Sequence, residues 1–247
     1  MDGALVALIK YLEILSPGLL LVSGFLICMG AILIVFRYFG SYGLVCYSVV
    51  AVIIANMQVL KLGVFAYIDE PVALGTIVFT TLFTTSDLIT EHYGAALAKK
   101  TIYLTFCMQI FVMLSMLVVI AHPGIDDSSQ VNAGLQALFT PSLRLLMSSV
   151  IAFVVSQHID INIFAYLKKR HGQNLLWLRG NLSTLVSGFI DNCLFSVLAW
   201  IVFSPRALSL NIVLIGFVGF SQIIRGAVSI LSTPLLYLSY RLKKHDL

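Results

Sequence analysis

Two carboxylates, Asp87 and Glu91, stand four residues apart in the otherwise uncharged run TTLFTTSDLITEHYG. Four-residue spacing places both on one face of a helix, with Thr84 about one turn before Asp87. Carboxylates in apolar surroundings accept N–H groups of a ligand or hold a cation. We interpret both acids as substrate-binding residues. Glu91 has a second explanation, in which its side chain only reaches toward the headgroups beside Lys99 and Lys100.

A second polar face occurs in VVSQHIDINIF. Gln157 and Asp160 are three residues apart, and Phe164 follows one turn later. An amide, a carboxylate and an aromatic ring on one face suit hydrogen bonding to and stacking on a planar heterocycle. Ser156 and Gln157 would also serve as polar contacts between helices, but such contacts do not need a carboxylate.

The run NLSTLVSGFIDNCLF places Ser183, Ser187 and Asp191 four residues apart. Asn192 follows Asp191, and Phe195 lies one turn beyond. This stripe predicts a polar helix face, and Asp191 near the middle of the apolar run is its strongest candidate for substrate binding.

Two basic residues, Lys61 and Arg225, stand well inside apolar runs. Buried carboxylates need positive partners or protons, so we expect charge-partner or gating roles for both, with direct ligand contact as the alternative. Asn56 before Lys61, and Gln222 before Arg225, fit either role. The four acids outnumber these two bases, which predicts an acid-rich interior.

The composition places these residues in a membrane. Hydrophobic residues make up 60% of the 247 residues, charged residues only 11%, and the mean hydropathy is +1.00. A span needs roughly 20 apolar residues. Runs of about this length occur at 19–36, 42–66, 71–91, 101–121, 142–167, 181–203 and 209–238. The expected fold class is an all-α polytopic membrane protein.

The first run differs from the rest because it has no ionisable residue before Arg37. We expect residues 1–40 to form a short amphipathic lead-in and one extra transmembrane helix. Residues 41–247 are then a six-helix transporter domain. The loops are short, and no linker between soluble domains is evident.

Basic residues follow alternate spans. Arg37, Lys99, Lys100, the cluster Lys168, Lys169, Arg170 and Arg179, and the tail Arg241, Lys243 and Lys244 lie on one side; Asp69, Glu70, Asp126, Asp127 and Arg206 lie on the other. The positive-inside rule predicts a cytoplasmic C-terminus and an N-terminus outside the cell. The charge therefore follows topology and indicates no nucleic-acid partner.

Several kinds of chemistry have no signature here. The chain lacks the nucleotide-binding loop, the zinc-protease motif, the nucleophile elbow and the G-x-G-D motif of intramembrane aspartyl proteases. The four cysteines have no zinc-like spacing, and we expect neither a metal nor a cofactor. The sequence predicts a transporter rather than an enzyme. An acid-pair enzyme using Asp87 and Asp191 is a remote alternative.

The motifs resemble those of the queuosine precursor transporters, also called the vitamin uptake transporter family. The resemblance runs from about Asn56 to the C-terminus. It rests on AN at 55–56 before Lys61, TSDLITEHYG at 85–94, SQHIDINIF at 156–164, STLVSGFIDN at 183–192 and Arg225. The extra first span and Ser187-Gly188, where members often have Ser-Gln, depart from the family pattern.

This resemblance implies import, across the inner membrane, of 7-deazaguanines such as 7-cyano-7-deazaguanine, 7-aminomethyl-7-deazaguanine or queuine, which modify the wobble position of certain tRNAs. For such a base, Asp191 or Asp160 would accept the two adjacent N–H groups. Its carbonyl would bind Gln157, Asn56 or Asn192, its ring would stack on Phe164 and Phe195, and a cationic side group would pair with Asp87 or Glu91.

The expected mechanism is alternating access, with a cytoplasmic gate in the region 87–100. Coupling to a proton or another ion, the preferred deazaguanine and the oligomeric state stay open. Two rival functions also stay open: a carrier or binding subunit for another solute or vitamin, and a structural factor whose buried charges only bridge helices.

Overall fold

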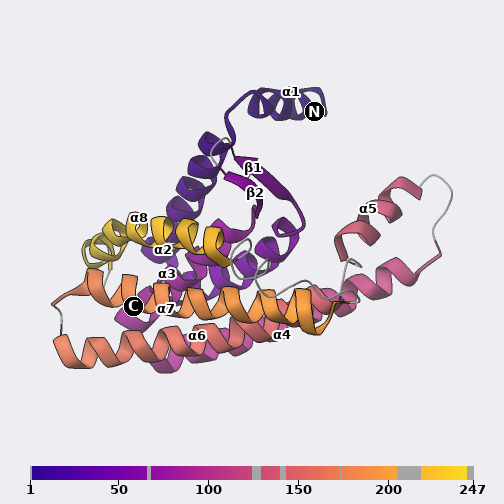
Figure 1. Cartoon of the computed structure of the whole chain (residues 1–247). Helices are drawn as coiled ribbons and strands as arrows, with labels where there is room; N and C mark the ends of the chain where they lie inside the picture. The colour runs from indigo at the N-terminus through magenta and orange to yellow at the C-terminus, as the bar shows by residue number, and fades with distance from the viewer. Residues whose placement is uncertain are drawn as a thin grey trace.

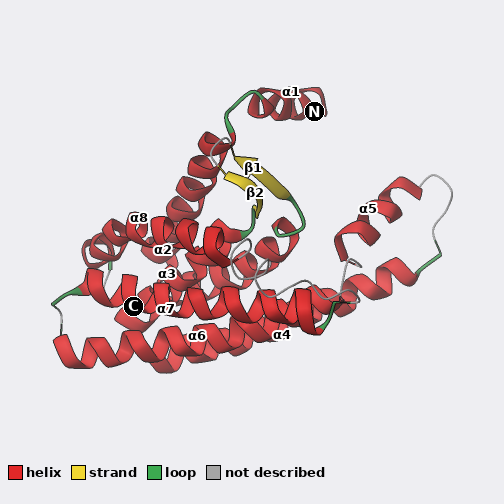
Figure 2. Cartoon of the chain, viewed as in Figure 1, coloured by secondary structure: helices red, strands yellow, loops and turns green. Residues whose placement is uncertain are grey.

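A computed structural model describes residues 2–65, 68–123, 129–139, 143–172, 174–204 and 218–243. Most of these residues are helical (Figures 1 and 2). The helices are α1 (Asp2–Glu13), α2 (Pro17–Gln58), α3 (Thr76–His92), α4 (Ala95–Ala121), α5 (Ser129–Phe139), α6 (Leu143–His171), α7 (Leu176–Val197) and α8 (Phe220–Leu242), and a π-helical turn, η2 (Leu198–Val202), continues α7. Two strands, β1 (Leu62–Phe65) and β2 (Ile68–Ala73), form an antiparallel hairpin.

Five helical stretches are long and apolar enough to cross a membrane. They are Pro17–Gln58, Ala95–Ala121, Met147–His171, Leu176–Val202 and Ser221–Leu242. The expected all-α membrane class is confirmed. The topology markers Asp126, Asp127, Arg206 and Lys244, and residues 209–217 of the last predicted span, lie outside the described residues.

The first two predicted spans form one long element, α2, with a sharp break at Gly40 (φ 55°, ψ −129°). A Cβ added to Gly43 would lie against the Val35 carbonyl group and 2.9 Å from Phe39 Cβ. In a straight helix, eight residues would separate Gly43 and Val35 by about 12 Å. The break therefore folds the two halves of α2 toward each other.

The predicted span 42–66 ends earlier than expected, because α2 stops at Gln58 and the chain enters the hairpin. The valine, phenylalanine and isoleucine residues of this region favour strands as well as apolar helices. Hydropathy alone does not distinguish the two structures. Lys61 consequently lies at the junction of α2 and β1, with its side chain exposed.

Helix α3 is the centre of the bundle. It contacts α2, α4, α6, α7 and α8, and almost every side chain from Thr76 to Glu91 is buried. Its buried threonine hydroxyls bond within the helix, for example Thr80 to the Thr76 carbonyl (2.8 Å) and Thr85 to the Thr81 carbonyl (2.8 Å). These internal bonds satisfy several of the hydroxyls that this polar helix brings into the middle of an apolar bundle, whereas Ser86 Oγ and Thr90 Oγ1 have no hydrogen-bond partner.

Candidate functional site

The stripe on α7 forms a line of polar contacts through the bundle. Ser183, Ser187 and Asp191 are all buried, and Arg179, one turn before Ser183, extends the stripe. Helices α6 and α7 run side by side (Figure 1), and α7 also contacts α3 and α8. Each stripe residue reaches an acidic or basic side chain on one of these neighbours, so α7 connects every buried charge described below.

At one end of the stripe, Arg179 pairs with Glu91 of α3. The guanidinium Nη2 lies 2.8 Å from Glu91 Oε1, and both side chains are almost fully buried. Lys168 of α6 lies 3.6 Å from the same carboxylate, and the hydroxyl of Tyr240 on α8 donates to it. Glu91 therefore links α3, α6, α7 and α8. Because its side chain is buried, the alternative explanation, that it only reaches toward the lipid headgroups, does not hold.

Arg179 is also fixed to the chain before α7. Its Nη1 donates to the carbonyls of Gly172 (2.6 Å) and Asn174 (3.2 Å), and its guanidinium lies 5.5 Å from the centre of the Phe164 ring. The charge pattern of the sequence places Arg179 in the cytoplasmic basic cluster and does not predict its burial. The available signal was its position four residues before Ser183, in phase with the stripe.

In the middle of the stripe, two serines bond two acids. Ser183 Oγ donates to Asp87 (3.4 Å), and Ser187 Oγ donates to Asp160 (3.0 Å). Both carboxylates are buried, and they are close enough to interact electrostatically. Among the described residues neither forms an ion pair, and Asp160 Oδ2 has no hydrogen-bond partner.

At the other end, Asp191 pairs with Arg225 of α8. Arg225 Nη2 lies 2.6 Å from Asp191 Oδ2, and Ser156 of α6 donates to Oδ1 (3.0 Å). The Arg225 guanidinium lies 5.8 Å from the centre of the Phe83 ring. Its Nε and Nη1 are buried without a hydrogen-bond partner, so Arg225 has donors left after pairing with Asp191.

A cavity of about 60 Å³ opens beside this pair. Four candidates from the sequence line it together: Asp191, Asn192 and Phe195 from α7, and Arg225 from α8. Asn192 also donates to Gln222 Oε1 (3.2 Å), which places Gln222 behind the cavity wall. This volume holds roughly four water molecules, so a bicyclic ligand needs the helices to move apart. We call this space the main cavity.

Other candidates lie elsewhere. Phe164 is fully buried beside Arg179 and is not among the residues lining the main cavity. Asn56 lines a neighbouring cavity of about 50 Å³, and Gln157 lines a smaller one of about 10 Å³. The prediction that Lys61 is buried is wrong, because the hairpin carries it out of the apolar helix.

Metal binding has no support in the described part of the chain, where no three His, Cys, Asp or Glu side chains gather as ligands would. The charged groups instead hold one another or accept from serines. The main cavity offers a ligand hydrogen bonds, charge and two aromatic rings, those of Phe79 and Phe195.

Long apolar helices around buried charges and a polar cavity are typical of a multi-pass membrane transporter. The comparisons with known proteins agree with this class. Residues 73–239 match the sequence model of a family described as "Putative vitamin uptake transporter", and the chain belongs to this family.

A relative from Bacillus subtilis (strain 168), named "Probable queuosine precursor transporter", is 30% identical over 219 residues. The match covers 87% of this chain and 91% of the relative. No solved structure matches the chain.

Proposed function

We propose that this protein imports queuosine precursors, the 7-deazaguanine bases used to modify tRNA, across the inner membrane. The name of the Bacillus subtilis relative supports the substrate class. The observation that carries the proposal is the gathering of Asp191, Asn192, Phe195 and Arg225 around one cavity. This set offers the groups that a guanine-like base requires.

The ligand chemistry follows from the donors and acceptors of the base. A guanine-like edge offers two adjacent N–H groups, which the Asp191 carboxylate accepts, and a carbonyl, which accepts from Arg225 Nη1 or Nε. Those two nitrogens are the Arg225 donors that are buried without a hydrogen-bond partner among the described residues. Phe195 supplies a ring for stacking, and Asn192 a further amide.

The buried acids Asp87 and Asp160 form no ion pair with any described base. We infer that these two carboxyl groups bind the ammonium of an aminomethyl or queuine-type side group, or a coupling proton, because a buried carboxyl group needs a positive partner or a proton. Glu91, by contrast, is held by Arg179, Lys168 and Tyr240, so we assign it to closure rather than to substrate binding.

Transport then follows alternating access. The Glu91 contacts close the end of the bundle formed by the last turns of α3, α6 and α8. The main cavity lies toward the opposite ends of these helices. With a cytoplasmic C-terminus, the Glu91 contacts are the inner gate and the main cavity is nearer the outside. Residues 41–247 form the transporter domain, which contains the gate and the main cavity. Residues 1–40 add a membrane anchor.

A growth and tRNA experiment tests the substrate class. A bacterial strain unable to make or import queuosine precursors is given this gene, and queuosine in its tRNA is measured after feeding each precursor at low concentration. We expect queuosine to appear with at least one 7-deazaguanine, and to be lost with Asp191→Asn. Expressed, folded protein that restores no queuosine with any precursor would instead favour transport of another solute.

A further inference from the structure

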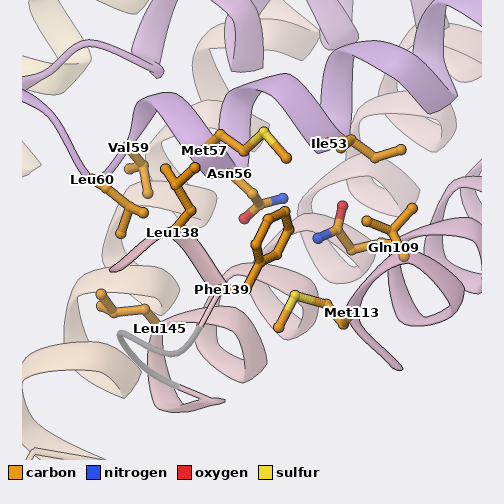
Figure 3. A pocket seen from close by; sticks show the side chains of 11 residues that line it. Ile53, Asn56, Met57, Val59, Leu60, Gln109, Met113, Leu138, Phe139 and Leu145 are labelled. Carbon is orange, nitrogen blue, oxygen red and sulfur yellow. The ribbon is translucent and has the colours of Figure 1, made fainter. Parts of the chain in front are cut away.

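A second cavity, of about 50 Å³, lies next to the main cavity (Figure 3). It is formed by the end of α2, the middle of α4, the end of α5 and the start of α6. Two of its described lining residues are polar, Asn56 and Gln109, and none is ionisable. Figure 3 shows both amides directed into the space between them, with the Phe139 ring close by.

Gln109 is the unusual member of this wall. Its side chain is 4% exposed, yet its Oε1 has no hydrogen-bond partner. A buried amide oxygen left without a partner costs free energy, so native proteins rarely keep one without a reason. A ligand N–H group in the cavity would satisfy it. The sequence alone does not indicate a role for Gln109, because no ionisable residue at helical spacing marks a charged face around it.

Asn56 is held ready for a ligand by two hydrogen bonds. Its Nδ2 donates to the Val52 carbonyl (2.8 Å), and its Oδ1 accepts from Ser149 Oγ (2.8 Å). An amide nitrogen carries two hydrogens and an amide oxygen two lone pairs, so one of each stays free. The fixed Asn56 amide can therefore donate to a ligand carbonyl while Gln109 accepts from the neighbouring N–H.

The two cavities adjoin at one shared lining residue. Val59 lines both of them. Ser149, which bonds Asn56, also lines the main cavity. The Ser149–Asn56 hydrogen bond thus stands between the uncharged cavity and the one with Asp191 and Arg225. Helix α5, which contacts α4, brings Phe139 to the wall of the uncharged cavity.

We propose that this cavity is an entrance subsite, which opens as the surrounding helices move apart and binds the uncharged lactam edge of a planar heterocycle before the molecule passes Ser149 into the main cavity. Gln109 accepts the lactam N–H, Asn56 donates to the lactam carbonyl, and Phe139 covers the ring. The identity of the heterocycle rests on the proposed function, whereas the existence of the subsite rests on its geometry alone.

Uptake kinetics test the subsite in proteoliposomes with radiolabelled queuine. Gln109→Met keeps the length of the side chain and removes the amide, and Gln58→Met makes the same change on the exposed end of α2. Loss of one neutral hydrogen bond lowers affinity by roughly 3- to 10-fold. We expect Gln109→Met to raise KM by this factor with little change in maximal rate, and Gln58→Met to match the wild type. Equal KM values for the two variants, or a loss of maximal rate alone, would overturn the subsite.

A labelling experiment separates this proposal from the transported substrate. In a chain whose four cysteines are replaced by alanine, Gln109→Cys and Ile110→Cys are exposed to a charged, membrane-impermeant maleimide from outside. Position 109 faces the cavity and should react when the helices move apart to admit a ligand, whereas Ile110 is exposed on the lipid side and should not. Absence of labelling at 109 refutes an entrance there. Labelling at 109 together with no uptake of queuine retains the entrance and refutes only the proposed substrate.

Discussion

The two bases that contact the buried Glu91 carboxylate differ in how exposed they are. Glu91 contacts two bases, of which Arg179 is almost fully buried and Lys168 is 35% exposed at the side chain. Breaking a buried ion pair by removing one partner is strongly destabilising, whereas a solvent-exposed partner contributes little. The closed end of the bundle therefore depends on Arg179 far more than on Lys168.

Replacing each base by methionine tests this difference. Arg179→Met should destabilise the protein by about 3 to 5 kcal/mol, because it leaves the Glu91 carboxylate largely unpaired. Lys168→Met should cost about 1 kcal/mol or less. Thermal unfolding midpoints in detergent measure both. Adding Glu91→Gln to Arg179→Met should restore part of the loss, and equal effects of the two single variants would contradict the assignment of Arg179.

Phe195 offers a test of ligand stacking that leaves the ion pairs intact. Aromatic stacking contributes about 0.5 to 1.5 kcal/mol beyond buried area, so Phe195→Ala should weaken binding of a 7-deazaguanine by roughly 3- to 10-fold. Phe189 is on the same helix but 52% exposed, and Phe189→Ala is the matched control. Equilibrium binding of radiolabelled queuine gives both affinities. If Phe189→Ala lowered the affinity for queuine as much as Phe195→Ala, stacking of the base on Phe195 would be contradicted.

At the scale of elements, the sequence predicted the apolar helices well because length and hydropathy are local properties. The i, i+4 spacing likewise predicted that Ser183, Ser187 and Asp191 share an inward face. What it could not provide is which helices meet. The sequence therefore suggested one site for Asn56 and Asp191, although they line different cavities. The exposure of Lys61 depends on a β-hairpin, which hydropathy alone does not distinguish from an apolar helix.

The break in α2 gives a prediction of its own. At Gly43 an added Cβ would press against the Val35 carbonyl and Phe39, whereas at Gly30 it would meet nothing within 4 Å. Overpacking of this kind costs typically about 1 to 3 kcal/mol, so Gly43→Ala should lower the unfolding midpoint. Gly30→Ala should leave the midpoint unchanged or raise it, since alanine favours helix. Equal midpoints for the two variants would mean that α2 does not fold back at Gly40.

In the whole molecule, the two ends of the helix bundle differ in the groups they contain. The Glu91 contacts and the last turn of α8 lie at one end of the bundle, and the two adjoining cavities lie toward the other. Basic residues concentrate near the Glu91 end, including Lys168, Lys169 and Arg170 in the last turn of α6. The positive-inside rule therefore predicts that the closed end faces the cytoplasm.

Reporter fusions test this orientation. A fluorescent protein that matures only in the cytoplasm should fluoresce when it is fused after Leu247, and a periplasmic phosphatase in the same place should stay inactive. Removing residues 1–40 should not invert these results, because the alternating basic residues beyond that point persist. Phosphatase activity at the C-terminus of the full chain would reverse the gate assignment and place the main cavity toward the cytoplasm.

A 7-deazaguanine that binds in the main cavity must stabilise the folded protein, so we would measure first how each ligand changes the thermal unfolding of the purified protein. Queuine and the two 7-substituted deazaguanines are added to wild type and to Asp191→Asn, with guanine as the comparison ligand. At 100 times the dissociation constant, a ligand stabilises the folded state by about 2.7 kcal/mol. We expect at least one deazaguanine to raise the unfolding midpoint of the wild type. We expect no shift of the midpoint in folded Asp191→Asn protein. No shift with any deazaguanine in folded wild type, or an undiminished shift in Asp191→Asn, would contradict binding in the main cavity.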